Sequence, residues 1–536
     1  MNYQNKYMKK ISVILLISLT LISCSTYKFI GSPITIKTAE SFNTKLSNED
    51  LKQKWSLLDI KSDKVPGMSV LKANKDLIKG QQGEKVIVAI IDSGVEIDHP
   101  YLSNFIWNNS DEIPNNGIDD DKNGYVDDIN GWNFLGKSDK ENLEYVRLYR
   151  KTNKDDSLSQ VYKNEIENAI NKNNQTIKRV QNLSKLLSES DSLISSILGK
   201  NRYSLEEARQ ISPKAFKIEQ AIDFLEFAKS NNWSKEGFSK SVDNYISSNN
   251  FHNNIDFKGR GEVGDDPDDF NDRNYGDSNV SDPNKHGTHV SGIVLSISNS
   301  SLIMPIRCVP DGDEYDKDVA LSIRYAVDNG AKIINFSFGK KYSPHSDWVI
   351  DAMKYASAND VLIVTASGND SNDVDSEKNQ TFPTDQIGGI EFIDNVLTVG
   401  ASTYNYDSKQ IANFSNYGSN NVDLFAPGFQ IYSSVLDGEF EYLNGTSMAA
   451  PNAAGVAAVL RSFYPKLSAP SIKKILIESG VYMFDELTFS NSQELSKSKR
   501  FSKSGKTINL YNALLLASNY KEKNPKKSLM RYRSKL

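Results

Sequence analysis

The sequence predicts an α/β fold in which a parallel β-sheet is flanked by helices, and three observations support this prediction. Continuous apolar runs such as 86–91 and 361–366 are typical of strands that are buried on both faces. From residue 286 to about 518, such runs alternate with stretches of helical pattern, an order that favours a parallel sheet with right-handed crossovers. The composition, 38% apolar and 24% charged, is ordinary for a soluble fold.

The elements can be assigned in chain order within one large domain, which we place at residues 65–518. Each strand is a short apolar run that ends in turn or polar residues. We expect strands at 86–91, 302–309, 332–338, 361–366 and 396–400. We expect one helix to begin at His286 and three more helices at 316–329, 346–358 and 448–463.

Three short motifs supply an acid, a base and a hydroxyl in a fixed order. They are Ile-Ile-Asp-Ser-Gly at 90–94, His-Gly-Thr-His-Val-Ser-Gly at 286–292 and Gly-Thr-Ser-Met-Ala-Ala-Pro at 445–451. A serine hydroxyl needs an adjacent base to become a nucleophile, and a buried carboxylate holds that base in the required tautomer. Asp92 ends the first strand, where open α/β sheets place their ligands, so the motifs predict a nucleophilic site at this edge.

Each of these residues also has an ordinary structural interpretation. Asp92 could cap the turn that follows it, and Ser447 could be a simple helix N-cap. The occurrence of all three motifs in one order favours catalysis, because the N-terminus of a helix at Ser447 also offers a free N–H to a developing anion. His289 lies one turn after His286 but lacks the Glu of a zinc-binding H-E-x-x-H helix, so we expect a structural, hydrogen-bonded histidine.

In these motifs the chain resembles the subtilases, the subtilisin-like serine proteases, over most of residues 65–518. The resemblance implies a catalytic triad of Asp92, His286 and Ser447. It also implies that Asn369, which follows the strand at 361–366, donates its side-chain amide to the oxyanion together with the serine N–H. The implied substrate walls are Ser337, Phe338 and Gly339 on one side and Ala366, Ser367 and Gly368 on the other.

The function implied by this resemblance is that of a serine endopeptidase, which hydrolyses peptide bonds of unfolded or looped polypeptides through an acyl-enzyme. No cofactor is expected for that chemistry. Two alternatives stay open: a dedicated processing protease with few partners, and a catalytically silent binding or scaffold lipoprotein. Silent relatives usually lose a triad member or the oxyanion Asn, and this chain keeps all four. A net charge of −5 does not point to nucleic acid, and we expect a monomer.

A large insertion separates the acid from the base. Asp92 and His286 are 194 residues apart, where compact subtilases have a few dozen, and we place the insertion at about 107–283. Its middle part, about 140–250, is polar with an amphipathic stripe, which predicts a projecting helical hairpin. The stripe comprises Ile166, Ile170, Ile177, Val180, Leu187, Ile194 and Leu198, and a capping box is expected at 204–207.

The first part of the insertion contains an acidic loop that is similar to a calcium-binding loop. Oxygen ligands recur at alternate positions, and Gly124 provides a sharp turn. The bidentate Glu of such loops is missing, with Asn130 in its place, so a solvated acidic turn remains an alternative. If the loop holds a structural calcium ion, the expected ligands are Asp119, Asp121, Asn123 and Asp127.

The N-terminal residues predict export of the protein from the cytoplasm. Lys9-Lys10 and the apolar stretch 11–22 are typical of a signal peptide, which we place at residues 1–23. Leu-Ile-Ser-Cys at 21–24 resembles a bacterial lipobox, which implies that Cys24 is lipidated and anchors the chain to a membrane, with the outer membrane or cell surface favoured. A plain secretory signal is the alternative. Residues 24–64 are expected to pack on the domain, and 519–536 form a basic tail.

Overall fold

The computed structural model describes residues 27–522, apart from 38, 43, 45, 47, 213–214, 231–232, 282–283 and 489–494. Cys24, the predicted signal peptide and most of the basic tail therefore lie outside the described residues. Among the residues described, no helix combines the length and the apolar character needed to cross a membrane.

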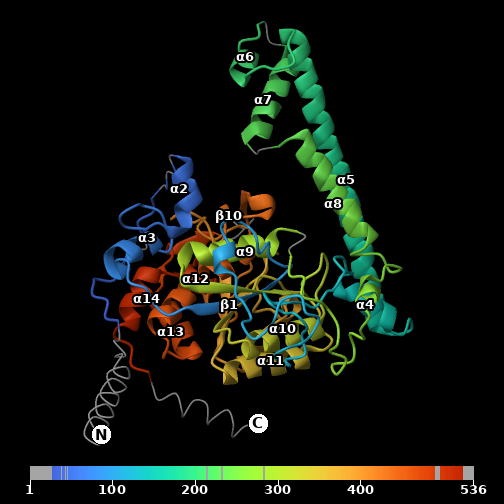
Figure 1. The fold of residues 1–536 in the computed structure, drawn as a ribbon. Coiled ribbons are helices and arrows are strands. Elements are labelled where there is room, and N and C mark those ends of the chain that lie inside the picture. The colour runs from blue at the N-terminus through green and yellow to red at the C-terminus, as the bar shows by residue number, and fades with distance from the viewer. Residues whose placement is uncertain are drawn as a thin grey trace, which may run out of the picture.

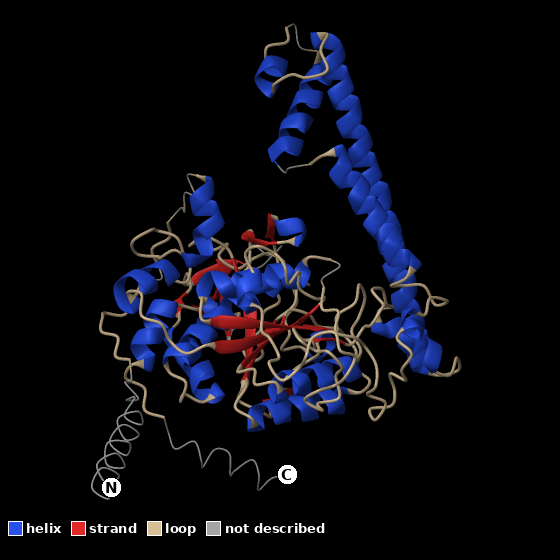
Figure 2. Ribbon diagram, in the orientation of Figure 1, coloured by secondary structure: helices blue, strands red, loops and turns tan. Residues whose placement is uncertain are grey.

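A central β-sheet forms the middle layer of the body (Figure 1, Figure 2). Within the described residues its nine strands lie in the order β12-β15-β9-β8-β5-β4-β1-β3-β2. All neighbours are parallel except β12 and β15, which are antiparallel. The strands are β1 (Val86–Asp92), β2 (Trp132–Asn133), β3 (Ser301–Arg307), β4 (Ile333–Phe336), β5 (Leu362–Ala366), β8 (Val396–Ser402), β9 (Leu424–Pro427), β12 (Val481–Tyr482) and β15 (Lys506–Thr507). The predicted α/β class is confirmed.

Helices cover both faces of the sheet, which explains why its central strands are apolar on both faces along most of their length. Along β1, Val88 and Ile90 belong to the core beneath one helical layer, and Ala89 and Ile91 belong to the core beneath the other. The first layer contains α9 (His286–Ile297), α12 (Thr446–Phe463), α13 (Ala469–Ser479) and α14 (Leu510–Ala517). The second contains α10 (Asp316–Asp328) and α11 (Ser346–Ala358).

A helical arm projects from this body (Figure 1), and we define it as residues 157–250. It follows the short helix α4 (Glu144–Lys151), and α5 runs from Ser157 to Leu198 before α8 returns beside it. Asn173 of α5 donates to the side chain of Asn249 across this pair, at 2.8 Å. The remaining helices are α6 (Leu205–Arg209), α7 (Phe216–Ser230) and α8 (Lys235–Asn250).

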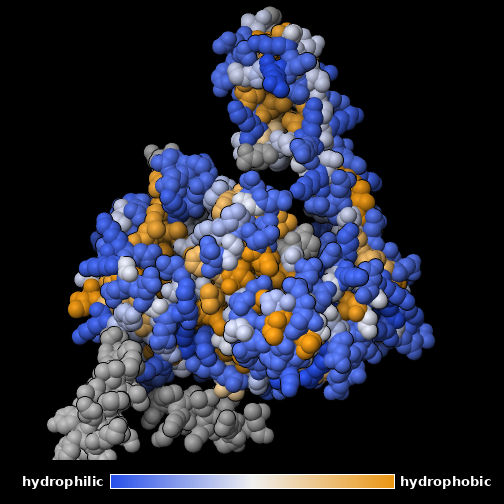
Figure 3. All heavy atoms as spheres, in the orientation of Figure 1, coloured by the Kyte–Doolittle hydropathy of each residue, from blue (hydrophilic) through white to orange (hydrophobic). Residues whose placement is uncertain are grey.

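The arm has an apolar core of its own. Three residues of the predicted stripe, Ile166, Leu187 and Ile194, are buried, and the other four are half-buried. Leu187 and Ile194 pack in one cluster with residues of α6, α7 and α8. The capping box at Ser204 is present, with Glu207 as its partner. Figure 3 shows apolar side chains gathered in the upper part of the arm. On α7, Phe216 and Phe227 are exposed.

Smaller elements complete the body. The N-terminal segment packs on it through Trp55, whose indole N–H donates to the carbonyls of Phe429 and Gln430 at 3.1 Å. This segment includes α2 (Glu49–Lys54) and precedes α3 (Val70–Ala73). Three two-stranded sheets lie outside the central one in the described residues: β6 (Gln386–Ile387) with β7 (Ile390–Glu391), β10 (Ile431–Ser434) with β11 (Phe440–Leu443), and β13 (Glu486–Thr488) with β14 (Leu495–Lys497).

Candidate active site

The acid and the base meet at the carboxyl edge of the sheet. Asp92 is the last residue of β1 and His286 the first residue of α9, and the distance from His286 Nδ1 to Asp92 Oδ1 is 2.7 Å. Asp92 is only 1% exposed, and its Oδ1 also accepts the Ser93 N–H at 2.8 Å. A carboxylate fixed in this way orients the imidazole through Nδ1 and leaves Nε2 as the atom for proton exchange.

A glycine permits this close approach of α9 to β1. A methyl group on Gly287 would lie 2.0 Å from the Gly94 carbonyl oxygen and 3.2 Å from Asp92 Cβ. The first of these distances is far inside van der Waals contact, so any side chain at this position would push the helix and His286 away from the carboxylate. Gly287 is therefore required in the second motif because any larger residue would clash with β1 and the turn that follows it.

Ser447 lies in the first turn of α12 and contacts the end of β4. Its Oγ donates to the Ser337 carbonyl at 3.0 Å, and Ser337 Oγ donates back to the Ser447 carbonyl at 2.9 Å. Asn335 Nδ2 in turn donates to Ser337 Oγ at 2.9 Å. This reciprocal pair fixes the turn that carries the hydroxyl. In this arrangement the Ser447 hydroxyl proton is directed at the Ser337 carbonyl.

Two hydrogen-bond donors converge on one open space beside Ser447. A Cβ placed on Gly445 would lie 3.5 Å from the Ser447 amide nitrogen and 3.6 Å from Asn369 Nδ2. The absence of a side chain at Gly445 therefore leaves a position next to both nitrogens unoccupied. Asn369 Oδ1 accepts from the N–H and the hydroxyl of Thr446, at 2.8 and 3.0 Å, which directs the amide nitrogen toward that position.

The two predicted walls follow the neighbouring strands β4 and β5. Ser337 is buried, Phe338 is half-buried and Gly339 is exposed on the first wall. On the second wall Ser367 is buried, whereas Ala366 and Gly368 are partly exposed.

A residue that the sequence did not single out holds the second wall in place. Asn416 is fully buried, and its Nδ2 donates to the Ser367 carbonyl at 2.9 Å. Its Oδ1 accepts the N–H groups of Asp370 and Asn372, at 3.0 and 2.9 Å. The three bonds fix the backbone on both sides of Asn369. Asn416 could not be predicted from the sequence, because no motif surrounds it and it lies 47 residues beyond Asn369.

A small cavity of 30 Å³ lies behind Ala366 and Ser367. Its walls carry hydroxyl, amide and apolar groups, and none of the residues that line it is ionisable. They are Thr365, Ala366, Ser367, Val374, Gln380, Thr381, Pro383, Thr384, Thr398 and Asn421. The cavity therefore has room for a small uncharged side chain.

His289 has the structural environment expected for it. The ring is fully buried, and Nε2 lies 3.1 Å from the Ile431 carbonyl oxygen and 3.2 Å from that of Glu441. Burial lowers the pKa of His289 to about 4, so the ring is neutral at pH 7 and Nε2 carries the donated proton. It fastens α9 to the β10–β11 hairpin.

In the acidic loop, the structure groups a set of carboxylates that differs from the expected one. Oxygen atoms of Glu112, Asp119 and Asp121 lie within 4.8 Å of one another. Asn123 is adjacent, since its Nδ2 donates to Asp121 Oδ2 at 3.0 Å. Asp127 adjoins this group through its N–H, which donates to Glu112 Oε2 at 3.1 Å, but its two carboxylate oxygens accept the N–H groups at 116 and 117. Glu112 precedes the loop, so the spacing of the loop itself gave no signal for it.

Comparisons with known proteins agree with the motifs. The sequence model of the Subtilase family matches residues 83–503. Over 205 residues the chain is 36% identical to a "Thermophilic serine proteinase" of Bacillus sp. (strain AK1), which covers 36% of this chain and 46% of that protein. It is 32% identical over 223 residues to a "Cell wall-associated protease" of Bacillus subtilis (strain 168), covering 40% of this chain and 22% of that protein. It is 31% identical over 225 residues to "Subtilisin DY" of Bacillus licheniformis, covering 40% of this chain and 77% of that protein.

The chain thus spans less than half the length of the first two relatives. The family match is broader, because residues 83–503 are more than half of the 536-residue chain and include all three motifs. The chain therefore belongs to the subtilase family.

Proposed function

We propose that this protein is a serine endopeptidase that hydrolyses peptide bonds of polypeptides through an acyl-enzyme on Ser447. The observation that carries the proposal is the geometry at one sheet edge. Asp92 holds His286 at 2.7 Å, and the Ser447 N–H and the Asn369 amide face the space that Gly445 leaves open. This is the set of groups that acyl transfer requires: an oriented base, a nucleophile and oxyanion donors.

In the proposed reaction, Ser447 Oγ bonds to the scissile carbonyl carbon while its proton passes to His286 Nε2. The carbonyl oxygen becomes an oxyanion that accepts from the Ser447 N–H and Asn369 Nδ2, and Asp92 stabilises the imidazolium. His286 then protonates the leaving amine as the C–N bond breaks, which leaves the acyl-enzyme. A water molecule repeats the sequence, with its proton taken by His286 and the serine as leaving group.

The direct test compares hydrolysis of an unfolded protein, such as reduced casein, by the wild type and by Ser447→Ala. We expect the variant to lose hydrolysis while its circular dichroism spectrum and thermal midpoint stay those of the wild type. Equal hydrolysis by the folded variant would place the activity at another site. A folded wild type without any hydrolysis would favour the scaffold alternative.

The cavity behind the second wall supports a preference for small uncharged side chains before the scissile bond. Its volume of 30 Å³ favours a small side chain over an aromatic ring, and none of its lining residues carries a charge that could pair with Arg or Glu. Peptide amides that differ only at this position test the preference through kcat/KM. We expect Ala to exceed Phe and Arg, and a preference for Arg would contradict the proposal.

We also propose that Glu112, Asp119 and Asp121 hold a structural calcium ion. The three carboxylates bring ligand oxygens within 4.8 Å of one another, and a hard divalent cation prefers oxygen ligands of this kind. Calorimetric titration of chelator-treated protein with Ca²⁺ should give one site, and Asp121→Asn should weaken it. Heat uptake that is equal in the wild type and in Asp121→Asn would contradict this site.

A lipid anchor at Cys24 and a location in the bacterial envelope remain proposals that rest on the lipobox. They are tested by metabolic labelling of producing cells with an alkyne fatty acid, followed by fractionation. We expect the label on the wild type and its loss in Cys24→Ala, with the variant released from the membrane fraction. Persistence of the label in the variant would contradict acylation of Cys24.

A further inference from the structure

The chain that leaves the first substrate wall is held by the helices before it in sequence. Directly after Ser337–Gly339, Lys340 Nζ lies 2.8 Å from Glu144 Oε2 on α4. Lys341 Nζ and the Tyr342 hydroxyl both donate to Glu165 Oε1 on α5, each at 2.6 Å. The ring of Tyr342 also packs edge-on against Tyr162 of α5, with 5.4 Å between centroids.

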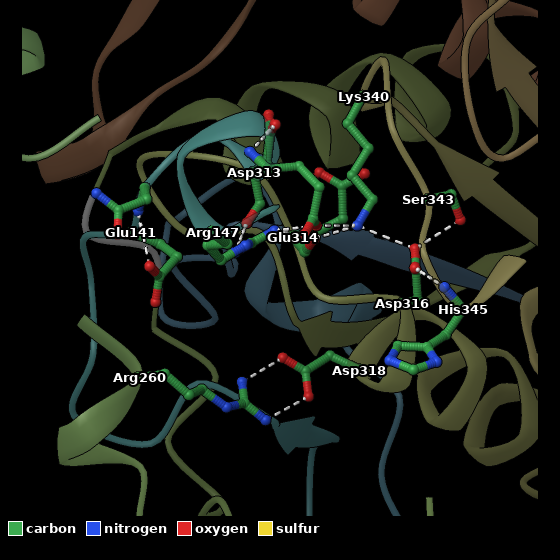
Figure 4. Close-up of polar contacts among 12 residues, drawn as sticks. Glu141, Arg147, Arg260, Asp313, Glu314, Asp316, Asp318, Lys340, Ser343 and His345 are labelled. Carbon is green, nitrogen blue, oxygen red and sulfur yellow. Dashed lines mark hydrogen bonds and ion pairs between the residues drawn. The ribbon is translucent and has the colours of Figure 1, made fainter. Parts of the chain in front are cut away.

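The first of these contacts belongs to a buried network of charges (Figure 4). Lys340 is only 5% exposed, and its ammonium group also contacts the Glu314 carbonyl at 2.7 Å and Asp316 Oδ1 at 2.9 Å. Arg147 of α4 binds Glu144 and donates to the Asp313 carbonyl at 2.8 Å. Burial opposes the ionisation of Glu144, but Arg147 and Lys340 lower its pKa to about 2, so it is charged at neutral pH.

The network continues along the same stretch of chain. Asp316 accepts from the Ser343 hydroxyl and the His345 N–H, both at 2.8 Å. His345 Nε2 lies 3.0 Å from Asp268 Oδ1, and Lys151 of α4 contacts the other oxygen of Asp268 at 2.6 Å. Groups of α4 and α5 therefore contact residues 340–342, and Asp268, in the segment that returns from the arm, contacts the ring of His345. Asp316 of α10 holds Ser343 and the His345 N–H.

A backbone pair connects this stretch to the second part of the substrate site. The Lys340 N–H donates to the Phe382 carbonyl at 2.9 Å, and the Phe382 N–H donates to the Lys340 carbonyl at 2.8 Å. Thr381 and Pro383, on either side of Phe382, line the small cavity behind the second wall. A cavity of 290 Å³ borders Lys340 and Phe382, so the pair is not packed tightly on all sides. A displacement of residues 340–342 would therefore reach both the wall and the small cavity.

We propose that Glu165, at the base of the arm, is a positioning residue for extended substrates. Through Lys341 and Tyr342 it fixes the strand end at 337–339, against which several substrate residues would lie. This inference rests on the proposed function for the identity of that strand as a substrate wall. Loss of the contact should weaken the binding of an extended peptide and leave the chemistry at Ser447 unchanged.

The test compares Glu165→Ala with Glu167→Ala on the same helix. Glu167 is a matched control, because its side chain is 57% exposed and its ion pair is with Lys163 of α5, at 3.8 Å. Glu165 is preferable to Lys340 as a target, since removal of one partner from a buried ion pair destabilises the whole fold. Each variant is assayed with a tetrapeptide amide and with the ester of a single acetylated amino acid.

For Glu165→Ala we expect KM for the tetrapeptide to rise about three- to tenfold, because the lost hydrogen bonds act on the substrate only indirectly, through the position of the strand end. The kcat for the tetrapeptide, the ester kinetics and the rate of fluorophosphonate labelling should match the wild type. Glu167→Ala should change none of these. Equal losses on both substrates, or equal behaviour of the two variants, would overturn the proposal.

A second readout does not depend on hydrolysis. In the Ser447→Ala background, binding of a fluorescent extended peptide is measured by anisotropy with and without Glu165→Ala. We expect the Kd to rise by the same three- to tenfold factor and to stay unchanged with Glu167→Ala. An unchanged Kd with Glu165→Ala overturns the positioning role even if the protein is a protease. Conversely, a raised Kd in a protein without hydrolysis would separate this role from the proposed activity.

Discussion

At the scale of single residues, the candidate site depends on two glycines as well as on its polar side chains. Gly445 leaves open the space that the Ser447 N–H and Asn369 Nδ2 share, and Gly287 lets α9 reach β1. Thr446 fixes the orientation of the Asn369 amide through two hydrogen bonds. In the proposed reaction, these donors are therefore in place before any substrate binds and need no rearrangement as negative charge develops.

Replacement of Asn369 by Ala should lower kcat by about 10²–10³-fold with little change in KM, a range established on a subtilisin rather than derived from this structure. The donor matters only once the oxyanion forms, which is why KM should be spared. Steady-state kinetics on a peptide amide provide the measurement. Thr446→Val is the control that keeps the Asn369 amide but removes one hydrogen bond that orients it. We expect a smaller decrease in kcat for this variant than for Asn369→Ala. A KM effect as large as the kcat effect would contradict this role.

His289 should make stability depend on pH. Its folded pKa of about 4 lies below the ordinary value of 6.5, so between these values the unfolded chain binds more protons. The contribution of His289 to the free energy of unfolding should therefore be fully present above pH 6.5. It should fall by up to about 3 kcal/mol as the pH drops to 4.

The measurement is urea unfolding from pH 7 to pH 4.5 for the wild type and His289→Gln. Gln keeps a donor for the Ile431 carbonyl but cannot be protonated. The variant should therefore lose less stability than the wild type over this range, after subtraction of the common trend from other groups. Parallel curves for the two proteins would show that His289 is not responsible.

At the scale of elements, the sequence was informative where both faces of a strand are buried. The runs at 86–91 and 361–366 correspond to β1 and β5 within one residue, because every position of these strands faces a core. The run at 302–309 extended two residues too far, since Cys308 is buried but follows the last paired residue, Arg307. A buried residue adds to an apolar run in the sequence whether or not it pairs with a neighbouring strand. The run therefore does not mark the residue at which strand pairing ends.

Other elements could not be predicted for reasons of length and separation. The edge strands β2 and β12, and β15 next to β12, have two residues each, too few for a periodic pattern. Glu112 and Asn416 join their sites through tertiary contacts across loops, where the sequence has no repeating pattern. In contrast, Asp92, His286 and Ser447 were identifiable because each lies inside a motif, at the end of a strand or in the first turn of a helix.

The packing of α9 on β1 can be tested with Gly287→Ala. The added methyl group would lie 2.0 Å from the Gly94 carbonyl, and we expect a loss of about 1–3 kcal/mol in unfolding free energy together with most of the activity. Gly261→Ala is the control, because a methyl group there meets nothing within 4 Å. Urea unfolding and peptide hydrolysis measure the two effects. Wild-type activity in Gly287→Ala would contradict the close approach.

At the scale of the whole molecule, the arm and the body have separate cores. The cluster at the tip of the arm contains residues of α5 to α8 and the loops between them, whereas both sheet cores are built from the body (Figure 1). The base of the arm is different, since Tyr162 and Glu165 contact Tyr342 of the body. The two parts of the arm should therefore contribute differently to the activity.

Removal of residues 178–243, with the ends of α5 and α8 joined by a glycine-rich turn, should leave the site intact. The remaining helices keep the Asn173–Asn249 contact and the whole base. We expect unchanged fluorophosphonate labelling and an unchanged KM for a tetrapeptide. A shorter protein that folds but fails to label would show that the tip supports the site. Loss of activity on folded proteins alone would assign the tip to their capture.

The most direct measurement is treatment of the purified protein with a fluorophosphonate probe, followed by peptide mass spectrometry to locate the adduct. Such a probe reacts with a serine that an oriented base and an oxyanion site activate together. The geometry of Asp92, His286 and Ser447 predicts a single adduct on Ser447, absent from Ser447→Ala and strongly reduced in His286→Ala. Folded protein that gives no adduct, or an adduct on a different serine, would contradict the proposed active site.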